Sequence, residues 1–318
     1  MFGTLYGMEL WLWLVVVGQL VMAVVAIIDK YVITSKTTAL RPFSYAFWIS
    51  VLSSGSVAVF LLGWVPVPIE GLSFPSFANV EAPSLVVFAL SVTAGYAFFS
   101  ALLSFFTALK RSDASDVVPV VGGLNAVFTL LLGYAFLDAE LPTHFTLGFV
   151  LLVVGTILVS QFRFSWRTML SVSHAGLMYG VHYVAIKALF ELTNFDTAFL
   201  WSRLAIVAVA VSMLLIPEYY ENVMRHTSKV RQRDGVLVIS NKILAGIGSL
   251  LLLKAIEFGD VALVQALGGL QYLYLLLFSA CCGWMISRDF GENVTSRDVV
   301  QKMLSVPLIV LGFFLLFL

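Results

Sequence analysis

Residues 108–125, ALKRSDASDVVPVVGGLN, and residues 255–271, AIEFGDVALVQALGGLQ, are two versions of one pattern. In each, an apolar segment ends in a turn that contains Asp, and a second apolar segment then carries Gly-Gly-Leu followed by an amide side chain. The pattern pairs Asn125 with Gln271 after a slip of one residue, and Pro119, present in the first copy only, explains the slip as a local bulge. The repeat predicts that the chain is built from two related halves.

The composition identifies the kind of chain. Of the 318 residues, 60% are hydrophobic and only 11% are charged, and the mean hydropathy is +1.00. A soluble globular enzyme has about 25% charged residues, so this class is excluded. The 18 basic and 18 acidic side chains balance, which leaves no basic face for nucleic acid. The two cysteines, Cys281 and Cys282, are adjacent and fit neither a disulfide framework nor a CxxC metal site. The sequence therefore predicts a polytopic membrane protein.

Ten apolar segments are long enough to cross a bilayer core of about 30 Å. They lie near 10–28, 43–65, 84–109, 117–137, 145–162, 168–186, 197–217, 235–253, 261–285 and 303–318. None alternates like a barrel strand, so we expect an all-α integral membrane protein. The halves are residues 1–163 and 164–318, with five spans each and together one transmembrane domain. Because five is odd, the two halves must insert in opposite orientations, as the inverted repeats of secondary transporters do.

The loop charges predict the orientation. The loops after the odd-numbered spans hold fourteen Lys and Arg residues, and those after the even-numbered spans hold two, Lys187 and Lys254. The positive-inside rule then places both termini outside the cytoplasm. We expect a multi-pass protein of a prokaryotic plasma membrane.

The stretch from Ala108 to Ser160, ALKRSDASDVVPVVGGLNAVFTLLLGYAFLDAELPTHFTLGFVLLVVGTILVS, resembles the core of the EamA-like drug/metabolite transporters. Shared features are an Ala-rich turn, a helix of small residues, a Glu soon after it and a Gly-containing helix. Glu140 corresponds to the family Glu, Glu292 to its counterpart, and Arg203 to an Arg often found in the seventh helix. Ala126 departs from the pattern, since the family often has Pro there. The resemblance implies ten helices and transport of small metabolites by alternating access. Many relatives are thought to have cytoplasmic termini, against the charge count.

Two cations lie inside predicted spans. Arg203 and Lys242 are each about seven residues from a span end, roughly 10 Å deep at 1.5 Å per residue. Ionisable groups at this depth are functional candidates by default, and Arg offers a fork suited to carboxylate or phosphate. The structural alternative is a side chain that snorkels to the membrane surface or bonds to carbonyls at a helix end.

Polar side chains elsewhere in the spans complete the candidate site. His174 and His182 are eight residues apart with Tyr179 between them. A histidine here either binds substrate or a coupling proton or forms a hydrogen bond across the helix bundle. Asn125 and Gln271 are matched amides that either face a central cavity or join helices. No metal-binding motif such as HExxH is present, and we expect no metal or cofactor.

Other features are predicted to be structural. Asp29 and Lys30, at the end of the first span, suggest an ion pair at the membrane surface. Gly176-x-x-x-Gly180 is a small-residue motif of the kind that packs helices together.

Two function classes follow from these observations. The first is a secondary transporter that moves a small polar metabolite, anionic or zwitterionic, through a central cavity between the halves. The second is a membrane-embedded enzyme or lipid-handling protein on the same scaffold. The inverted repeat and the absence of a catalytic motif favour the first class, with no catalytic residue assigned. The expected partners are a small-molecule substrate, the lipid bilayer and a coupling proton or ion, with the chain as a monomer or homodimer.

Overall fold

The computed structural model describes residues 2–34, 41–69, 72–112, 114–138, 143–160, 164–227, 232–275, 277–278 and 296–315, and in these ranges all regular structure is helical. The elements are α1 (Phe2–Thr34), α2 (Pro42–Ser53), η1 (Ser54–Leu62), η2 (Phe77–Asn79), α3 (Leu85–Arg111), α4 (Ala114–Phe136), α5 (Thr143–Leu158), α6 (Trp166–Leu192), α7 (Phe195–Ser212), η3 (Met213–Leu215), α8 (Pro217–Thr227), α9 (Gln232–Phe258), α10 (Val261–Ala266) and α12 (Ser296–Leu315).

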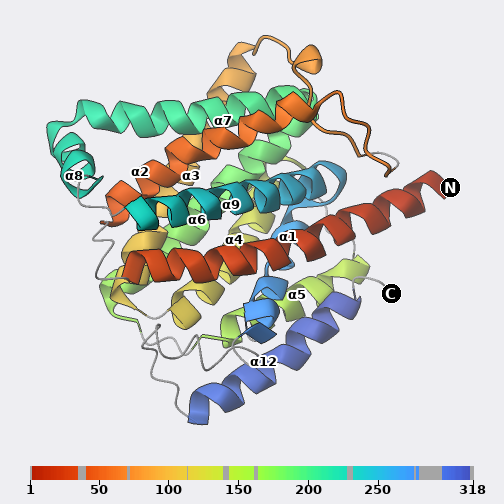
Figure 1. Ribbon diagram of the computed structural model, residues 1–318. Helices are drawn as coiled ribbons and strands as arrows, with labels where there is room; N and C mark the ends of the chain where they lie inside the picture. Colours follow the sequence, from red (N-terminus) through yellow and green to blue (C-terminus); the bar gives the residue numbers. More distant parts are fainter. Residues whose placement is uncertain are drawn as a thin grey trace.

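The long helices lie side by side, so that their ends collect on two opposite sides of the molecule (Figure 1). One side, which we call the terminal side, holds the start of α1 and the end of α12 (right in Figure 1). The other, the α8 side, holds the short helix α8 (left in Figure 1). Helix α8 lies in the polar segment between α7 and α9, and the described part of the Pro-containing linker after Trp64 is irregular apart from η2.

Within the described ranges, six helical segments are long and apolar enough to cross a membrane: Leu10–Val32, Pro42–Leu62, Leu85–Arg111, Asp116–Phe136, Phe195–Leu215 and Gly235–Phe258. Shorter apolar helices occupy Phe145–Leu158, Val261–Leu275 and Leu304–Leu315. Helix α6 is 27 residues long but more polar than these. The described chain is therefore compatible with a multi-pass membrane protein, and all ten expected spans contain helix.

Side chains at the ends of helices satisfy backbone groups that a helix leaves unpaired. Ser84, Ser165, Asn194 and Asp260 each accept a hydrogen bond from a backbone N–H in the first turn of α3, α6, α7 and α10. Each is a preferred N-cap residue. The N-cap Asp260 is one of the two aspartates of the repeated pattern, whereas its expected counterpart, Asp113, lies outside the described residues.

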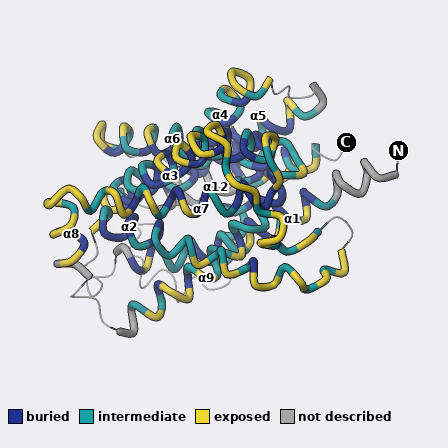
Figure 2. The backbone as a smooth tube through the Cα atoms, turned by 90° about the horizontal axis from the view of Figure 1, so that it is seen from above, coloured by how far each residue is buried: buried dark blue, intermediate teal, exposed yellow. Residues whose placement is uncertain are grey.

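Many large apolar side chains of the described residues are exposed, and Figure 2 shows exposed positions along the outer helices of the bundle. Trp64 and Leu85 are 83% exposed and Leu215 is 85% exposed, and all three lie near helix ends. Exposed large apolar groups are expected where lipid replaces water.

Close contacts between helices depend on small residues. A Cβ on Gly176 of α6 would lie 2.7 Å from Leu124 of α4, and one on Gly180 would lie 2.9 Å from Phe128. The predicted packing role of this glycine pair is therefore confirmed.

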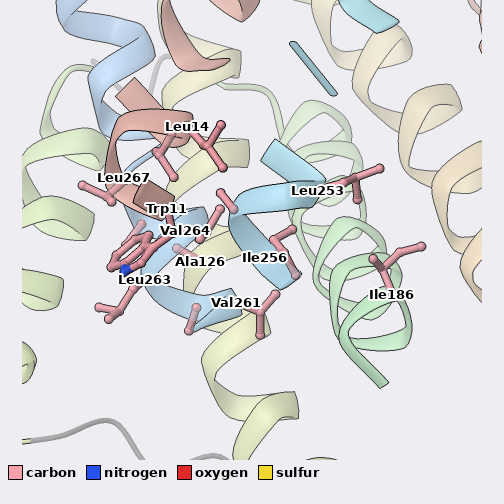
Figure 3. Packing of buried hydrophobic residues seen from close by; sticks show 14 of the residues in the cluster. Trp11, Leu14, Ala126, Ile186, Leu253, Ile256, Val261, Leu263, Val264 and Leu267 are labelled. Carbon is pink, nitrogen blue, oxygen red and sulfur yellow. The ribbon is translucent and has the colours of Figure 1, made fainter. Parts of the chain in front are cut away.

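A buried apolar cluster joins the two predicted halves near the terminal side (Figure 3). It includes Trp11 and Leu14 of α1, Ile256 of α9, and Leu263 and Val264 of α10. Since α1 starts at the terminal side and α9 ends there, these five residues lie between that side and the middle of the bundle. They form an apolar seal, the name we keep for them below.

Candidate functional site

A cavity of about 270 Å³ lies between the helices. Its walls come from α1, α2, η1, α3 and α4 in the first half and from α6, α7, α9 and the 261–275 helix in the second. It extends from mid-depth, at Arg203, toward the α8 side, where Asp29 and Leu109 lie within two turns of the ends of α1 and α3. The apolar seal lies between the cavity and the terminal side.

Arg203 lies in the middle of α7 and is only 5% exposed. Its Nη2 donates to Ser249 Oγ at 2.8 Å, and the guanidinium lies 5.1 Å from the centre of the Phe199 ring. Its Nε is buried without a hydrogen-bond partner, and no carboxylate of the described chain pairs with it. A buried cation without a counter-ion is costly, so this group has unused capacity to bind an anion.

Lys242, in contrast, is already paired with an acid. Its Nζ lies 2.8 Å from Asp29 Oδ1, and the side chains of the two residues are 8% and 15% exposed. Asn241 Nδ2 donates to the same oxygen at 2.8 Å, and the Tyr45 hydroxyl donates to it as well. The Asp29 carboxylate thus holds together α1, α2 and α9.

This pairing corrects the role expected for Asp29 at the sequence level. Asp29 and Lys30 are not a surface pair: Asp29 binds Lys242, which is 213 residues away along the chain, and both residues of the expected pair line the cavity. The reason is that α1 continues six residues past the apolar run that ends at position 28. The last turns of the helix therefore still lie within the bundle.

His182 lines the cavity and is 3% exposed. Its Nδ1 lies 2.9 Å from the Ala94 carbonyl oxygen, so Nδ1 carries the hydrogen, and in the neutral ring Nε2 is an acceptor. The His182 ring packs 5.0 Å from that of Phe98. Tyr179, one turn earlier on α6, also lines the cavity.

The matched amides, Asn125 and Gln271, both line the cavity and also join helices. The two roles expected as alternatives are therefore both present. Asn125 donates to Gln265 Oε1 at 2.8 Å, which links α4 to α10. Gln271 donates to the Met22 carbonyl oxygen at 3.0 Å, which links the 261–275 helix to α1.

His174 lies away from the site. Its Nδ1 is 2.8 Å from Ser104 Oγ on α3, and it is not among the residues that line the cavity. The two histidines are on one helix but separated by about 80° of rotation, so only one of them faces the cavity. The expectation that His174 contacts substrate is therefore not supported by its position.

Three cavity residues have no counterpart among the sequence candidates: Asp29 as an ion-pair partner, Gln265 and Ser249. Tyr45, buried behind the cavity wall, was not predicted either, and its hydroxyl donates to Asp29. The near-repeat itself offered a signal for Gln265, since it lies six residues before Gln271 in the same pattern.

Glu140, Glu292 and the cysteines lie outside the described residues. Within the described ranges, no cluster of three or more His, Cys, Asp or Glu residues could hold a metal ion.

Comparison with known proteins adds the fold alone. No family model matches the chain, and no curated protein matches it. A solved structure described only as "Crystal structure of protein" is similar to it, with a TM-score of 0.63, 16% sequence identity and coverage of 95% of this chain and 96% of that chain. Likeness of fold does not carry function.

Proposed function

We propose that the protein is a secondary transporter that carries a small anionic or zwitterionic metabolite across the membrane by alternating access. The cargo would bind in the central cavity between the two predicted halves, with Arg203 as its main anchor. The observation that carries the proposal is the buried, uncompensated Arg203 on the wall of a cavity that both halves line.

The charge of the cavity supports the cargo class. Arg203, Lys30 and Lys242 line it, against one carboxylate among the described lining residues, that of Asp29. Opposite charge offsets part of the cost of moving an anion out of water, whereas an organic cation would be repelled at short range. Tyr179, His182, Asn125 and Gln271 would contribute hydrogen bonds and packing to the neutral part of the cargo.

Helix directions support the division into inverted halves, residues 1–163 and 164–318. In this assignment α1, α2, α3, α4 and α5 correspond to α6, α7, α9, α10 and α12. Helix α1 starts on the terminal side, and α6 ends there, because Lys187 near its end donates to the carbonyl oxygens of Ile256 and Gly259 at the end of α9.

Helix packing follows the same symmetry. Helix α3 packs on α6, and α9, the counterpart of α3, packs on α1, the counterpart of α6. Counterparts α4 and α10 pack on one another, as do α5 and α12. These relations are those expected of a two-fold axis in the membrane plane, and they fit the resemblance to EamA-like transporters.

The extent of the cavity supports one particular state of the alternating-access cycle. It reaches toward the α8 side and is separated from the terminal side by the apolar seal. With the α8 side cytoplasmic, as the loop charges predict, this would be an inward-facing state.

Counterflow in proteoliposomes tests the proposal. Purified protein is reconstituted with unlabelled succinate, glutamate or glycerol 3-phosphate inside, and uptake of the labelled compound is followed, with neutral sugars and basic amino acids as comparisons. We expect saturable exchange of at least one acidic compound and none of the basic ones. Exchange limited to cations, or chemical turnover of a compound without flux, would contradict the proposal.

A further inference from the structure

The Asp29 carboxylate lies on the cavity wall among several hydrogen-bond donors. One of its oxygens, Oδ1, accepts from Lys242 Nζ and from Asn241 Nδ2, each at 2.8 Å, and from the Tyr45 hydroxyl. These are one cationic and two neutral donors converging on a single oxygen, which is the donor set of an anion-binding site. In this structure the anion among these donors is the protein's own Asp29 carboxylate.

The polar groups around this carboxylate come from four helices: α1, α2, α6 and α9. Helix α9 provides Asn241 and Lys242, α2 provides Tyr45, and α6 provides Tyr179 on the opposite wall. Lys30 follows on α1 itself.

Helix α3 contributes only apolar side chains to the cavity: Phe98, Leu102, Phe105, Phe106 and Leu109. The other ionisable groups of the described lining are Arg203, His182, Tyr183 and Tyr272. The first three lie deeper, at mid-depth, and the Tyr272 hydroxyl donates to the Val118 carbonyl oxygen. Asp29 is thus the sole carboxylate in the described lining and lies nearer the α8 side than the Arg203 anchor.

Charge balance links proton binding to anion binding at this place. While Asp29 is ionised, an anion near Lys242 meets a like charge and competes for a donor that is already used. When a proton from water binds the Asp29 carboxylate, the ion pair is lost and Lys242 keeps a positive charge with no counter-ion. A buried unpaired charge is unfavourable, so an anion bound to Lys242 stabilises the protonated state, and the proton stabilises the bound anion.

We propose that Asp29 is the proton-coupling site of this transporter. When the Asp29 carboxylate is protonated, it no longer pairs with Lys242, and Lys242 then binds the anionic cargo. The inference rests on the proposed function and adds its energy source: one proton enters with each anion and leaves with it on the other side, when Asp29 loses the proton and pairs with Lys242 again. The transporter is then a proton–anion symporter, in which Arg203 anchors the anion and Lys242 senses the protonation of Asp29.

The experiment measures proton and anion uptake in the same vesicles. Full-length protein is reconstituted in liposomes containing the pH-sensitive dye pyranine, and labelled succinate, glutamate or glycerol 3-phosphate is added outside. For the wild type, we expect the lumen to acidify as the anion enters. We also expect the apparent affinity to rise by up to about tenfold for each unit by which the pH falls, the limit for one linked proton.

Asp29→Asn removes the proton site with little change in shape. We expect this variant to exchange the anion without acidifying the lumen and with an affinity that no longer depends on pH. Asp196→Asn is the matched control, because Asp196 is a buried carboxylate in a span and accepts hydrogen bonds from Ser76 N and Asn79 Nδ2 in the linker on the terminal side. This control should keep the wild-type coupling. The double variant Asp29→Asn/Lys242→Met, which buries no unpaired charge at this place, should lose coupling and bind the anion at least about tenfold more weakly.

The outcomes separate the two proposals. If an acidic compound exchanges and Asp29→Asn still acidifies the lumen, or if Asp196→Asn abolishes coupling equally, the coupling role of Asp29 is wrong while the transport function stands. If Asp29→Asn does not fold, the double variant decides: retained pH dependence in it contradicts the inference. If none of the three compounds exchanges with the wild type, the proposed cargo class is wrong and the inference falls with it.

Discussion

Replacing Arg203 by Met should weaken cargo binding without destabilising the protein. A charged hydrogen-bond donor contributes about 1.5–3 kcal/mol, so its loss should raise the Kd of an acidic cargo by about tenfold to 150-fold. The affinity of a neutral compound should not change by the same factor. The position of Arg203 on the cavity wall, with a buried and unpartnered Nε, is the structural reason.

The effect on stability follows from the same contacts. Arg203→Met loses the bond to Ser249 and the contact with the Phe199 ring, which together contribute about 2–3 kcal/mol. It also removes a buried charge without a counter-ion, whose effective burial cost is several kcal/mol. A well-packed Met should therefore leave the protein as stable as the wild type or more stable.

Thermal unfolding in detergent, with and without succinate, glutamate or glycerol 3-phosphate, measures both effects. The expected result is an equal or higher Tm without ligand and a smaller ligand-induced shift. A lower Tm together with an unchanged ligand-induced shift would refute the reasoning, because it would make Arg203 a structural residue. Arg203→Lys keeps the charge but not the forked guanidinium. We expect its ligand-induced Tm shift to lie between those of the wild type and Arg203→Met.

Three further predictions concern the ion pair, the orientation and the closed side. Lys242→Met should destabilise the protein by up to about 3 kcal/mol, because it leaves the part-buried Asp29 carboxylate without its cation, and adding Asp29→Asn should recover most of that loss in the same unfolding assay; equal stability of the single and double variants would contradict this. In a cysteine-free background, Glu221→Cys on α8 should resist a membrane-impermeant thiol reagent in intact cells and Ala78→Cys should react, and the reverse pattern would overturn the orientation. Lys187→Met should speed hydrogen exchange at the end of α9, because Lys187 donates to two carbonyl oxygens there, and exchange as slow as in the wild type would show that these bonds do not hold the closed side together.

The helical framework is largely readable from the sequence, since apolar runs of about 20 residues have few other solutions in a bilayer. The packing role of Gly176 and Gly180 could also be predicted, because spacing of four places two residues on one face of a helix. The ends of helices are harder to predict. Hydropathy marks where apolar residues stop, near position 28, whereas α1 continues to Thr34.

The site could be predicted only in part, because its main contacts join residues far apart in the chain. Charge at membrane depth and repeat symmetry pointed to Arg203, Lys242 and the two matched amides, and all four line the cavity. Nothing local indicates that Lys242 binds Asp29, since that pairing depends on how α9 packs against α1. The pairing changes the electrostatic account from two unpaired cations to one anchor and one ion pair.

The most direct test of alternating access is the two-sided reactivity of a cysteine inside the cavity. Gly246 of α9 suits this purpose, because it lines the cavity and a Cβ there would come no closer than 3.7 Å to any neighbour outside its own helix. Gly246→Cys in a cysteine-free background is labelled with a polar, impermeant thiol reagent in right-side-out and in inverted vesicles, with Ile243→Cys on the exposed face of α9 as the control. The account predicts that Gly246→Cys reacts from both sides of the membrane, that a transported anion slows labelling, and that Ile243→Cys does not respond to the anion. Reaction from one side only, with or without the anion, would contradict a cavity that opens alternately to both sides.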